Sequence, residues 1–455
     1  MKKLCIFTVV TLCILLVSCK NDSNTDTSNE SLTPPEIIFQ ESETNENLAE
    51  ETTYETEESH VSPLEPVEPE ITELALKEVT LELKDTQIID ASPLYYTETL
   101  GSRKTYENML PQIIGFEYPY VYYERMSAIV KDANPTDPDL YVGRYSIETK
   151  ESQEFPIERF SAISSEARLV VNKDCLVYMY FLDGRMVSEL FNFADTTRKI
   201  LDDALAHNVF GYPKKLSDNE IILFMYESTP DGARQKINLY DLTSDELVEI
   251  YRGDIMGGYK DSETSTKDIF AITTYNNCIY LLMHQYYENQ MHSYIQKLDK
   301  NGNLLSEEKI NALSQYNTLE DTADSLVIMG DYAIVHFMRI NRSENNTNPL
   351  SAVLYHTNEG YKLFDVGEKI ELNVYCGIGH APLSTAFFGI HNDMDTIFAC
   401  ATQTNEGISI NINGTGVVAS SVDSKGNLLV VTRENDNSEW YVVSSDQFIN
   451  LCFSE

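Results

Sequence analysis

Seven apolar segments, each typical of a buried β-strand, recur along the chain. They begin at Tyr120, Cys175, Glu220, Cys278, Tyr332, Thr396 and Asn427, at intervals of 55, 45, 58, 54, 64 and 31 residues. Most follow a two-residue turn signal such as Asn276-Asn277 or Gly330-Asp331. A second turn signal comes roughly nine to fourteen residues after each start. This spacing predicts one small antiparallel unit repeated along the chain.

The repeated unit is typical of a propeller blade, in which tight turns join four antiparallel strands. The segment Ile237 to Leu242, followed by the turn Thr243-Ser244-Asp245, is one of its later strands. We therefore predict an all-β protein with a seven-bladed β-propeller; six or eight blades are the alternatives, and a β-sandwich or a pair of sandwiches is the rival fold. The short last interval indicates that blade six or seven is incomplete.

Two local patterns bear on how such a ring is completed. The segment from Glu78 to Leu83 alternates with period two, so we predict a strand that closes the ring beside the C-terminal blade. Thr197 to His207 is the best local candidate for a helix. Blade segments such as Ile237 to Leu242 resemble those of TolB-like bacterial propellers, a resemblance that implies the fold and carries over no functional residue.

The N-terminus has the pattern of a secretory signal. Lys2 and Lys3 precede the largely apolar run Leu4 to Val17, which is too short to span a membrane as a helix. The sequence Leu16-Val17-Ser18-Cys19 resembles the lipobox of bacterial lipoproteins. That resemblance implies a signal peptide over residues 1–18 and a lipid anchor on Cys19, which places the protein on the outer face of the cell membrane. The alternative is an ordinary thiol after a signal cleaved elsewhere.

Residues 19–75 differ in composition from the rest of the mature chain. Residues 20–75 hold sixteen Asp and Glu side chains against one basic residue, Lys20, with five prolines among Ser, Thr and Asn. Because such a segment buries too little apolar surface to offset the entropy of ordering, we expect a disordered acidic tether. A cation-binding acidic arm is the alternative. Residues 76–455 are then the propeller domain.

The charge of residues 76–455 limits the partners of the chain. This part carries 56 acidic and 30 basic side chains, which argues against binding nucleic acid or anionic lipid headgroups. We expect a monomer attached to the membrane through its lipid alone. Five cysteines remain after Cys19 with no Cys-x-x-Cys pair among them, so we expect free, buried thiols.

Motifs that carry chemistry are scarce. The chain has no Gly-x-Ser-x-Gly, His-Glu-x-x-His, P-loop or dinucleotide motif, so we assign no catalytic residue and no cofactor. Asp299 to Asn303 begins like a calcium loop, and Ser421 to Gly426 resembles the Asp-box of sialidase-type propellers; we interpret both as turns.

Three other groups of residues are candidates for binding. The best metal candidate is His380, His391, Asp393 and Asp395, but the two aspartates fall on a turn signal, so no metal is predicted. His284 and His292 flank a hairpin tip and are given the same structural interpretation. The tyrosines of Tyr118 to Tyr123 are interpreted mainly as strand residues, although some would suit a binding face.

These observations favour binding over catalysis. We expect an extracytoplasmic, lipid-anchored propeller that binds or scaffolds a protein, peptide or glycan on one face of the ring. The alternative is a hydrolase or lyase acting on extracellular glycans or peptides at the axial channel. Such an enzyme would have carboxylate, His or Tyr side chains with shifted pKa values that converge on the channel. A third possibility is an assembly factor for envelope proteins.

Overall fold

A computed structural model describes most of the chain after residue 71. The described residues are 72–73, 76–100, 104–126, 140–157, 168–182, 185–201, 211–256, 266–287, 290–313, 321–339, 351–365, 385–390, 396–401, 406–413, 416–434 and 437–453. The chain divides into two units, Met1–Glu65 and Pro66–Glu455, and every described residue belongs to the second.

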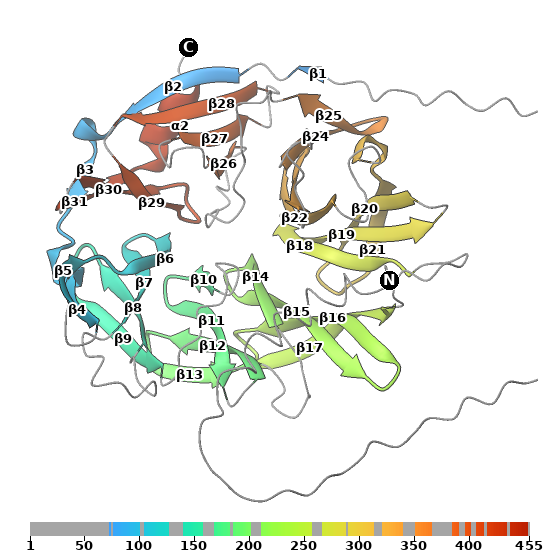
Figure 1. Cartoon of the computed structure of the whole chain (residues 1–455), viewed down its shortest axis with the longest axis horizontal. Helices are drawn as coiled ribbons and strands as arrows, with labels where there is room; N and C mark the ends of the chain where they lie inside the picture. Colours follow the sequence, from blue (N-terminus) through green and yellow to red (C-terminus); the bar gives the residue numbers. More distant parts are fainter. Residues whose placement is uncertain are drawn as a thin grey trace, which may run out of the picture. The chain divides into compact units, whose positions relative to one another are not determined.

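Apart from one separate hairpin, the described strands form seven sheets that follow one another as the blades of a β-propeller (Figure 1). Blades 1 to 4 are each one continuous piece of chain whose strands pair in sequence order. Their bounds are β6 (Gln112–Glu117), β7 (Tyr120–Met126), β8 (Leu140–Ser146) and β9 (Ser152–Ile157); β10 (Arg168–Asn172), β11 (Cys175–Leu182), β12 (Arg185–Asn192) and β13 (Thr197–Ile200); β14 (Gly211–Ser217), β15 (Glu220–Thr229), β16 (Gly232–Asp241) and β17 (Glu246–Ile255); and β18 (Asp268–Tyr275), β19 (Cys278–Tyr287), β20 (Gln290–Leu298) and β21 (Leu304–Lys309).

Blades 5 to 7 combine strands from both ends of the second unit. Blade 5 has β22 (Asp321–Met329), β23 (Tyr332–Arg339), β24 (Ser351–Thr357) and β25 (Gly360–Asp365), with β1 (Thr72–Glu73) added as a fifth strand. Blade 6 has β26 (Thr385–Ile390), β27 (Thr396–Ala401) and β28 (Glu406–Asn413), completed by β2 (Leu76–Glu82). Blade 7 has β29 (Val417–Val422), β30 (Leu428–Glu434) and β31 (Asn437–Val443), completed by β3 (Gln87–Ile89). The prediction of an all-β, seven-bladed propeller is therefore confirmed.

The N-terminal strands close the ring, but not with the predicted partner. The strand predicted at Glu78 to Leu83 is β2, and it lies parallel to β28 of blade 6, with Glu78 opposite Ser409. The C-terminal blade is completed instead by β3, which lies antiparallel to β31, with Ile88 opposite Tyr441. The prediction of closure by the N-terminal segment holds, whereas the assigned neighbour of β2 was wrong. The short last interval is explained, because blade 6 has no outer strand of its own between β28 and β29; blade 7 also lacks one, after β31.

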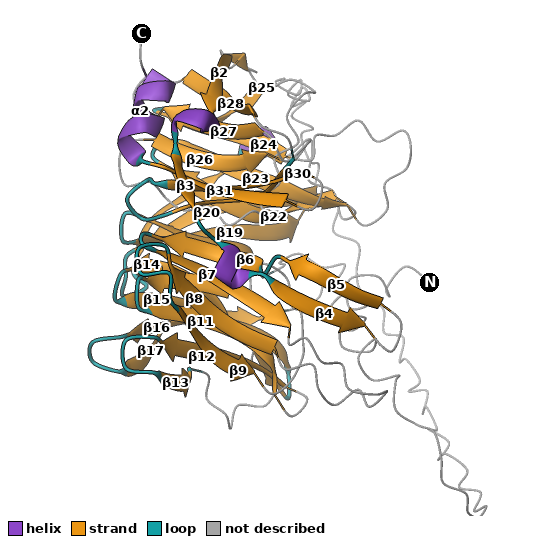
Figure 2. Cartoon of the chain, turned by 90° about the vertical axis from the view of Figure 1, so that its left-hand side faces the viewer, coloured by secondary structure: helices purple, strands orange, loops and turns teal. Residues whose placement is uncertain are grey.

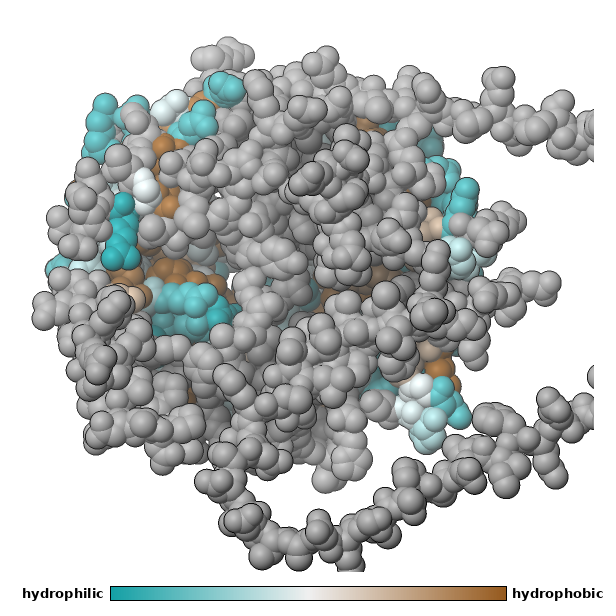
Figure 3. Space-filling model, in the orientation of Figure 1, coloured by the Kyte–Doolittle hydropathy of each residue, from teal (hydrophilic) through white to brown (hydrophobic). Residues whose placement is uncertain are grey.

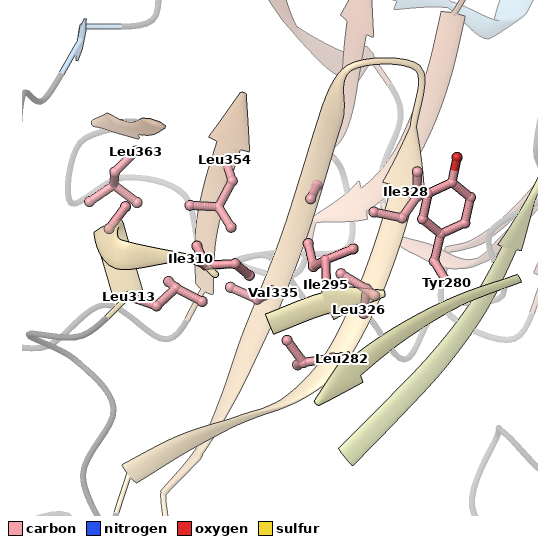
Figure 4. Packing of buried hydrophobic residues seen from close by; sticks show 12 residues of the cluster. Tyr280, Leu282, Ile295, Ile310, Leu313, Leu326, Ile328, Val335, Leu354 and Leu363 are labelled. Atoms are coloured by element: carbon pink, nitrogen blue, oxygen red, sulfur yellow. The ribbon is translucent and has the colours of Figure 1, made fainter. Parts of the chain in front are cut away.

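Six apolar cores join neighbouring blades of the described part. Blades 4 and 5, for example, are held by Leu282 and Ile295 on one side and Leu326 and Val335 on the other (Figure 4). A similar cluster joins blade 7 to blade 1, around the buried Trp440. This last cluster brings the end of the chain against the first blade.

Few residues of the described part are helical. The helix predicted from Thr197 is wrong at its start, because Thr197–Ile200 is strand β13, the outer strand of blade 2. The described α-helix, α2, spans Ser445–Phe453, and short 3₁₀ turns lie at Leu83–Asp85, Ser92–Leu94 and Asn311–Leu313. Among the described residues, no helix is both long enough and apolar enough to cross a membrane.

The two ends of the blades differ. At one end, tight turns join the first strand to the second and the third to the fourth, as at residues 276–277 and 299–303. At the other end, the chain passes between blades through longer connections, including 158–167, 202–210 and 366–384, which lie outside the described residues. Figure 2 shows the turns gathered on one side, with the separate hairpin of β4 (Tyr96–Leu100) and β5 (Lys104–Met109) projecting on the opposite side. We call these the turn end and the loop end.

Candidate functional site

A hollow between blades 3 and 4 at the loop end is the best candidate site in the described part of the chain. It has a volume of about 470 Å³. Its lining comes from the end of β17, the residues just before β18, and the middle of β19 and β20. The lining residues are Tyr251, Arg252, Gly253, Asp254, Thr266, Lys267, Met283, Gln285 and Gln296. Most of them offer polar groups, which suits a hydrogen-bonding ligand more than an apolar one.

The strand pattern explains why these side chains meet. Met283 and Gln285 are two residues apart on β19, so they point to the same face of the blade. Ile279, Leu281 and Met283 from that face pack against blade 3 deeper in the same interface. Towards the loop end the apolar pattern gives way to glutamine, and the interface opens into the hollow.

A salt bridge holds one wall of the hollow. Lys267 Nζ donates to Glu307 Oε1 at 2.5 Å, and Gln296 Nε2 donates to Glu307 Oε2 at 2.5 Å. The Lys267 ammonium also lies 4.2 Å from the centre of the Tyr294 ring. Burial acts to raise the pKa of Glu307, but the hydrogen bonds from Lys267 and Gln296 outweigh it and hold the pKa below its ordinary value. This wall is therefore preorganised.

Carboxylates gather around Tyr251. Burial raises the pKa of this phenol, and the charges of Asp254, Glu307 and Asp268 raise it further. Burial likewise raises the pKa of Asp268 to about 6, against an opposing hydrogen bond from Thr266 and with a further contribution from Asp254. The protonation state of Asp268 therefore changes near pH 6.

Asp268 begins a row of polar residues that crosses the three inner strands of blade 4. It lies opposite His284 on β19, which lies opposite Ser293 on β20. His284 Nδ1 and Ser293 Oγ are 2.8 Å apart, and the Phe270 ring lies edge-on to the imidazole at 4.3 Å. Because His284 and Ser293 are almost fully buried, they belong to the interior of the blade. His292 is also buried, and its ring stacks on Tyr287 at 3.7 Å.

A second buried polar cluster joins blades 1 and 2 at the loop end. Arg168 Nη2 donates to Glu124 Oε1 at 2.7 Å, and Tyr178 donates to Glu124 Oε2 at 2.8 Å. With its amide oriented to match these partners, Gln112 donates to Glu124 at 2.7 Å and accepts from Arg168 at 2.8 Å. The carboxylate is thus enclosed by donors, and the cluster is structural.

The two predicted turns share one geometry. Asp299 Oδ1 accepts from the backbone N–H of Asn301 and Asn303, and Gly302 adopts a φ of +83°. In the second turn Asp423 Oδ1 accepts from Lys425 and Asn427 in the same way, and Gly426 has a φ of +84°. Both carboxylates are occupied by their own backbone, which confirms the interpretation as turns.

The other residues singled out from the sequence divide into two groups. Cys19 and the metal candidates His380, His391, Asp393 and Asp395 lie outside the described residues. Within the described part, no group of three potential metal ligands comes together. Tyr122 and Tyr123 are buried in the strand, as expected. The thiols of Cys175 and Cys278 are both free, but only Cys175 is buried as predicted, and Cys278 at the start of β19 is partly exposed. The hollow had not been predicted, because its residues come from four separate segments with no shared motif.

Comparison with known proteins supports no closer assignment. No family model matches the chain, and no curated protein matches it. Among solved structures, the β-propeller domain of the trilobed protease from Pyrococcus furiosus is 10% identical, with 80% of this chain and 98% of that chain covered and a TM-score of 0.43. An ulvan lyase from a polysaccharide lyase family is 10% identical, with 74% and 93% covered and a TM-score of 0.44.

TolB from Acinetobacter baumannii is also similar, at 12% identity, with 72% of this chain and 78% of that chain covered and a TM-score of 0.33. The chain spans about half the length of the similar peptidases, for example 52% of Pyrococcus horikoshii acylaminoacyl peptidase. At such low similarity the comparisons carry no argument about function, and the propeller assignment depends on the seven sheets.

Proposed function

We propose that the protein is an extracytoplasmic lipoprotein whose propeller binds a protein, peptide or glycan partner at the loop end, through the hollow between blades 3 and 4. One observation carries the binding part of this proposal: a preorganised polar hollow of about 470 Å³ opens at that end. Loops and pockets on a rigid scaffold are the usual place of recognition.

The chemistry of the lining favours an uncharged, hydrogen-bonding ligand that is rich in hydroxyl or amide groups. Gln285 and Gln296 present amides, and Thr266 presents a hydroxyl. Lys267, Arg252 and Asp254 add charges of both signs, so no single ligand charge is selected. Tyr251 and Met283 add flat or flexible apolar surface, which suits sugar rings and peptide side chains.

Binding can be tested with the full chain on arrays of soluble glycans and peptides. We expect one ligand class to bind, and we expect Gln285→Ala or Lys267→Ala to weaken it while Ile88→Ala, at an exposed residue of blade 7, leaves it unchanged. A ligand that binds equally well to all three variants would show that the hollow is not its binding site.

Anchoring is supported by the sequence alone. Under this proposal Cys19 is lipidated, residues 20–75 form a tether whose last part includes β1 (Thr72–Glu73) of blade 5, and residues 76–455 are the propeller domain, held on the outer face of the cell membrane. Metabolic labelling with a fatty acid should mark the wild-type chain and not Cys19→Ala, which should also leave the membrane fraction. Equal labelling of both would contradict the anchor.

A hydrolase or lyase remains the second candidate, and a specific observation favours it. Burial raises the pKa of Asp268 to about 6, with a smaller contribution from the charge of Asp254, and a carboxyl group with a raised pKa is suited to act as a general acid. Turnover of a polysaccharide that Asp268→Asn abolishes, with binding retained, would establish this candidate in place of simple binding.

A further inference from the structure

Gln235 is a polar side chain inside the interface between blades 3 and 4. Figure 3 shows mainly hydrophilic residues at the surface of the described part and hydrophobic ones deeper. Gln235 departs from this pattern, since it is only 3% exposed. It lies on β16 two residues before Ile237, which packs against blade 4, so both side chains point toward that blade. A buried amide is costly unless its polar atoms find hydrogen-bond partners.

The partners of Gln235 are the two backbone groups of one residue of blade 4. Its Nε2 donates to the carbonyl oxygen of Ile269 at 2.6 Å, and its Oε1 accepts from the N–H of Ile269 at 2.7 Å. Two residues of an antiparallel pair exchange the same two bonds, so the amide acts as a neighbouring strand would. Ile269 lies on β18, the first strand of blade 4. Gln235 therefore ties β16 of blade 3 to β18 of blade 4.

Two β-bulges meet at this tie. In the pairing of β16 with β17, the single residue Gln235 lies opposite two residues, Gly253 and Asp254. In the pairing of β18 with β19, Phe270 is an extra residue directly after Ile269. Bulges bend a strand and re-aim its side chains, and they are common next to active sites. Here the bulge of β17 supplies two residues that line the hollow, Gly253 and Asp254.

Opposite walls of the hollow depend on the tie. On the blade 3 side, a Cβ on Gly253 would lie 3.3 Å from the backbone oxygen of Gln235, so this wall packs closely on β16. On the blade 4 side, Lys267 precedes Ile269 by two residues, and Met283 lies opposite Ile269 on β19. Gly253, Lys267 and Met283 line the hollow, whereas Gln235 does not. Gln235 thus connects the walls from behind the lining.

Blades 3 and 4 are held separately near the turn end. Gly302, in the turn before β21, lies so close to the carbonyl oxygen of Ile250 that no Cβ fits between them. Lys300 Nζ also donates to Glu220 Oε1 at 3.0 Å. These contacts hold the two blades together without Gln235. Loss of the tie should therefore loosen the loop end of the interface, where the hollow lies, without separating the blades.

We propose that Gln235 is a positioning residue for the hollow. It touches no ligand, and by holding Ile269 it fixes the distance between the wall with Gly253 and the wall with Lys267. The inference rests on the proposed function, because it concerns the affinity of the ligand bound there. An amide is required, since it both donates and accepts. A carboxylate can accept from the Ile269 N–H but cannot donate to the Ile269 carbonyl oxygen.

The test compares the full wild-type chain with Gln235→Met, which keeps the length of the side chain and removes the amide. The matched control is Asn238→Leu, since Asn238 is a buried amide on the opposite face of β16 and donates to Met225 Sδ at 3.1 Å. Backbone hydrogen exchange is measured in peptides covering residues 266–269, and binding is measured on the glycan and peptide arrays. We expect Gln235→Met to speed this exchange by at least about tenfold and to weaken binding by at least about fivefold. Asn238→Leu should leave both within about twofold.

A third variant, Gln235→Glu, separates positioning from a general loss of stability. When protonated, the introduced carboxyl group can donate to the Ile269 carbonyl oxygen, and when ionised it cannot. Relative to wild type at the same pH, exchange over residues 266–269 should therefore be near normal at pH 4 and fast at pH 8. Taking each value relative to wild type removes the contribution of Asp268, whose pKa is about 6. Gln235→Met should show no such recovery at low pH.

The remaining outcomes would overturn the proposal. Unchanged exchange in Gln235→Met would show that the tie does not hold β18, and equally fast exchange in Asn238→Leu would show a general loss of stability. Unchanged affinity of Gln235→Met for an array ligand that Gln285→Ala weakens would remove the positioning role and leave the proposed function intact. If no array ligand binds, the proposed function fails, and the exchange measurements alone decide whether Gln235 holds the wall.

Discussion

Arg168 Nη2 lies 2.7 Å from Glu124 Oε1, and this ion pair joins β10 of blade 2 to β7 of blade 1. The side chains are only 6% and 10% exposed, so neither charge is well solvated. Breaking such a pair leaves a buried charge without its partner, which is far more costly than losing an exposed pair.

Replacing Arg168 should therefore destabilise the propeller. We expect Arg168→Met to lower the free energy of unfolding by about 3–5 kcal/mol, measured by urea denaturation. Lys150→Met, in the exposed pair with Asp90, should cost no more than about 1 kcal/mol. Adding Glu124→Gln to Arg168→Met should restore part of the loss, because the buried charge is then removed. Equal losses of unfolding free energy in Arg168→Met and Lys150→Met would contradict the claim that the buried cluster stabilises the propeller.

The contact between Gly302 and Ile250 gives a second prediction. Gly302→Ala places a methyl group against the Ile250 carbonyl and also strains a backbone with a φ of +83°. Gly426→Ala, with a φ of +84° in the matching turn, reports the cost of the backbone conformation in that turn. We expect the free energy of unfolding of both variants to fall by at least about 1 kcal/mol, measured by denaturant titration. Gly302→Ala should be the less stable of the two variants. If Gly302→Ala is tolerated as well as Gly426→Ala, blades 3 and 4 are not fastened at this turn.

The raised pKa of Asp268 makes stability depend on pH. Its pKa is about 6 in the folded chain and 3.8 as the ordinary value, so the folded state holds the proton more tightly. Its contribution to stability is greatest below pH 3.8 and is lost as pH rises through 6, by about 3 kcal/mol in total. Asp268→Asn should remove this fall and be more stable than wild type at pH 8. If the free energies of unfolding of the two proteins change in parallel between pH 4 and pH 8, the raised pKa of Asp268 is refuted.

The second strand of each blade was the part of the fold that the sequence predicted most accurately. The starts predicted at Tyr120, Cys175, Glu220, Cys278, Tyr332 and Thr396 are the first residues of β7, β11, β15, β19, β23 and β27. Both faces of these strands pack against neighbouring blades, as in β11, where Leu176 packs on blade 1 and Val177 on blade 3, so the run is apolar throughout and easy to recognise. Outer strands such as β13, with the sequence Thr-Arg-Lys-Ile, lack that signal, and this is why a helix was predicted there.

The partners of the N-terminal strands and the candidate site could not be predicted from the sequence. Alternation in the segment of β2 reports which side chains share a face, but it does not say whether β28 or β31 lies beside the strand. The hollow likewise depends on Asp254, Lys267 and Gln285, which lie on different elements and come together only after blades 3 and 4 pack. Neither relationship leaves a local pattern in the chain.

The closure of the ring by the strands β1, β2 and β3 is the central structural claim. It is tested most directly by comparing thermal unfolding of chains that start at residue 20, 66 or 90. The first two retain β1, β2 and β3, so we predict one cooperative transition at the same temperature. The third exposes the outer edges of blades 5, 6 and 7, and we predict that it unfolds at a markedly lower temperature or aggregates. A chain starting at residue 90 that unfolds at the same temperature as the other two would contradict the account.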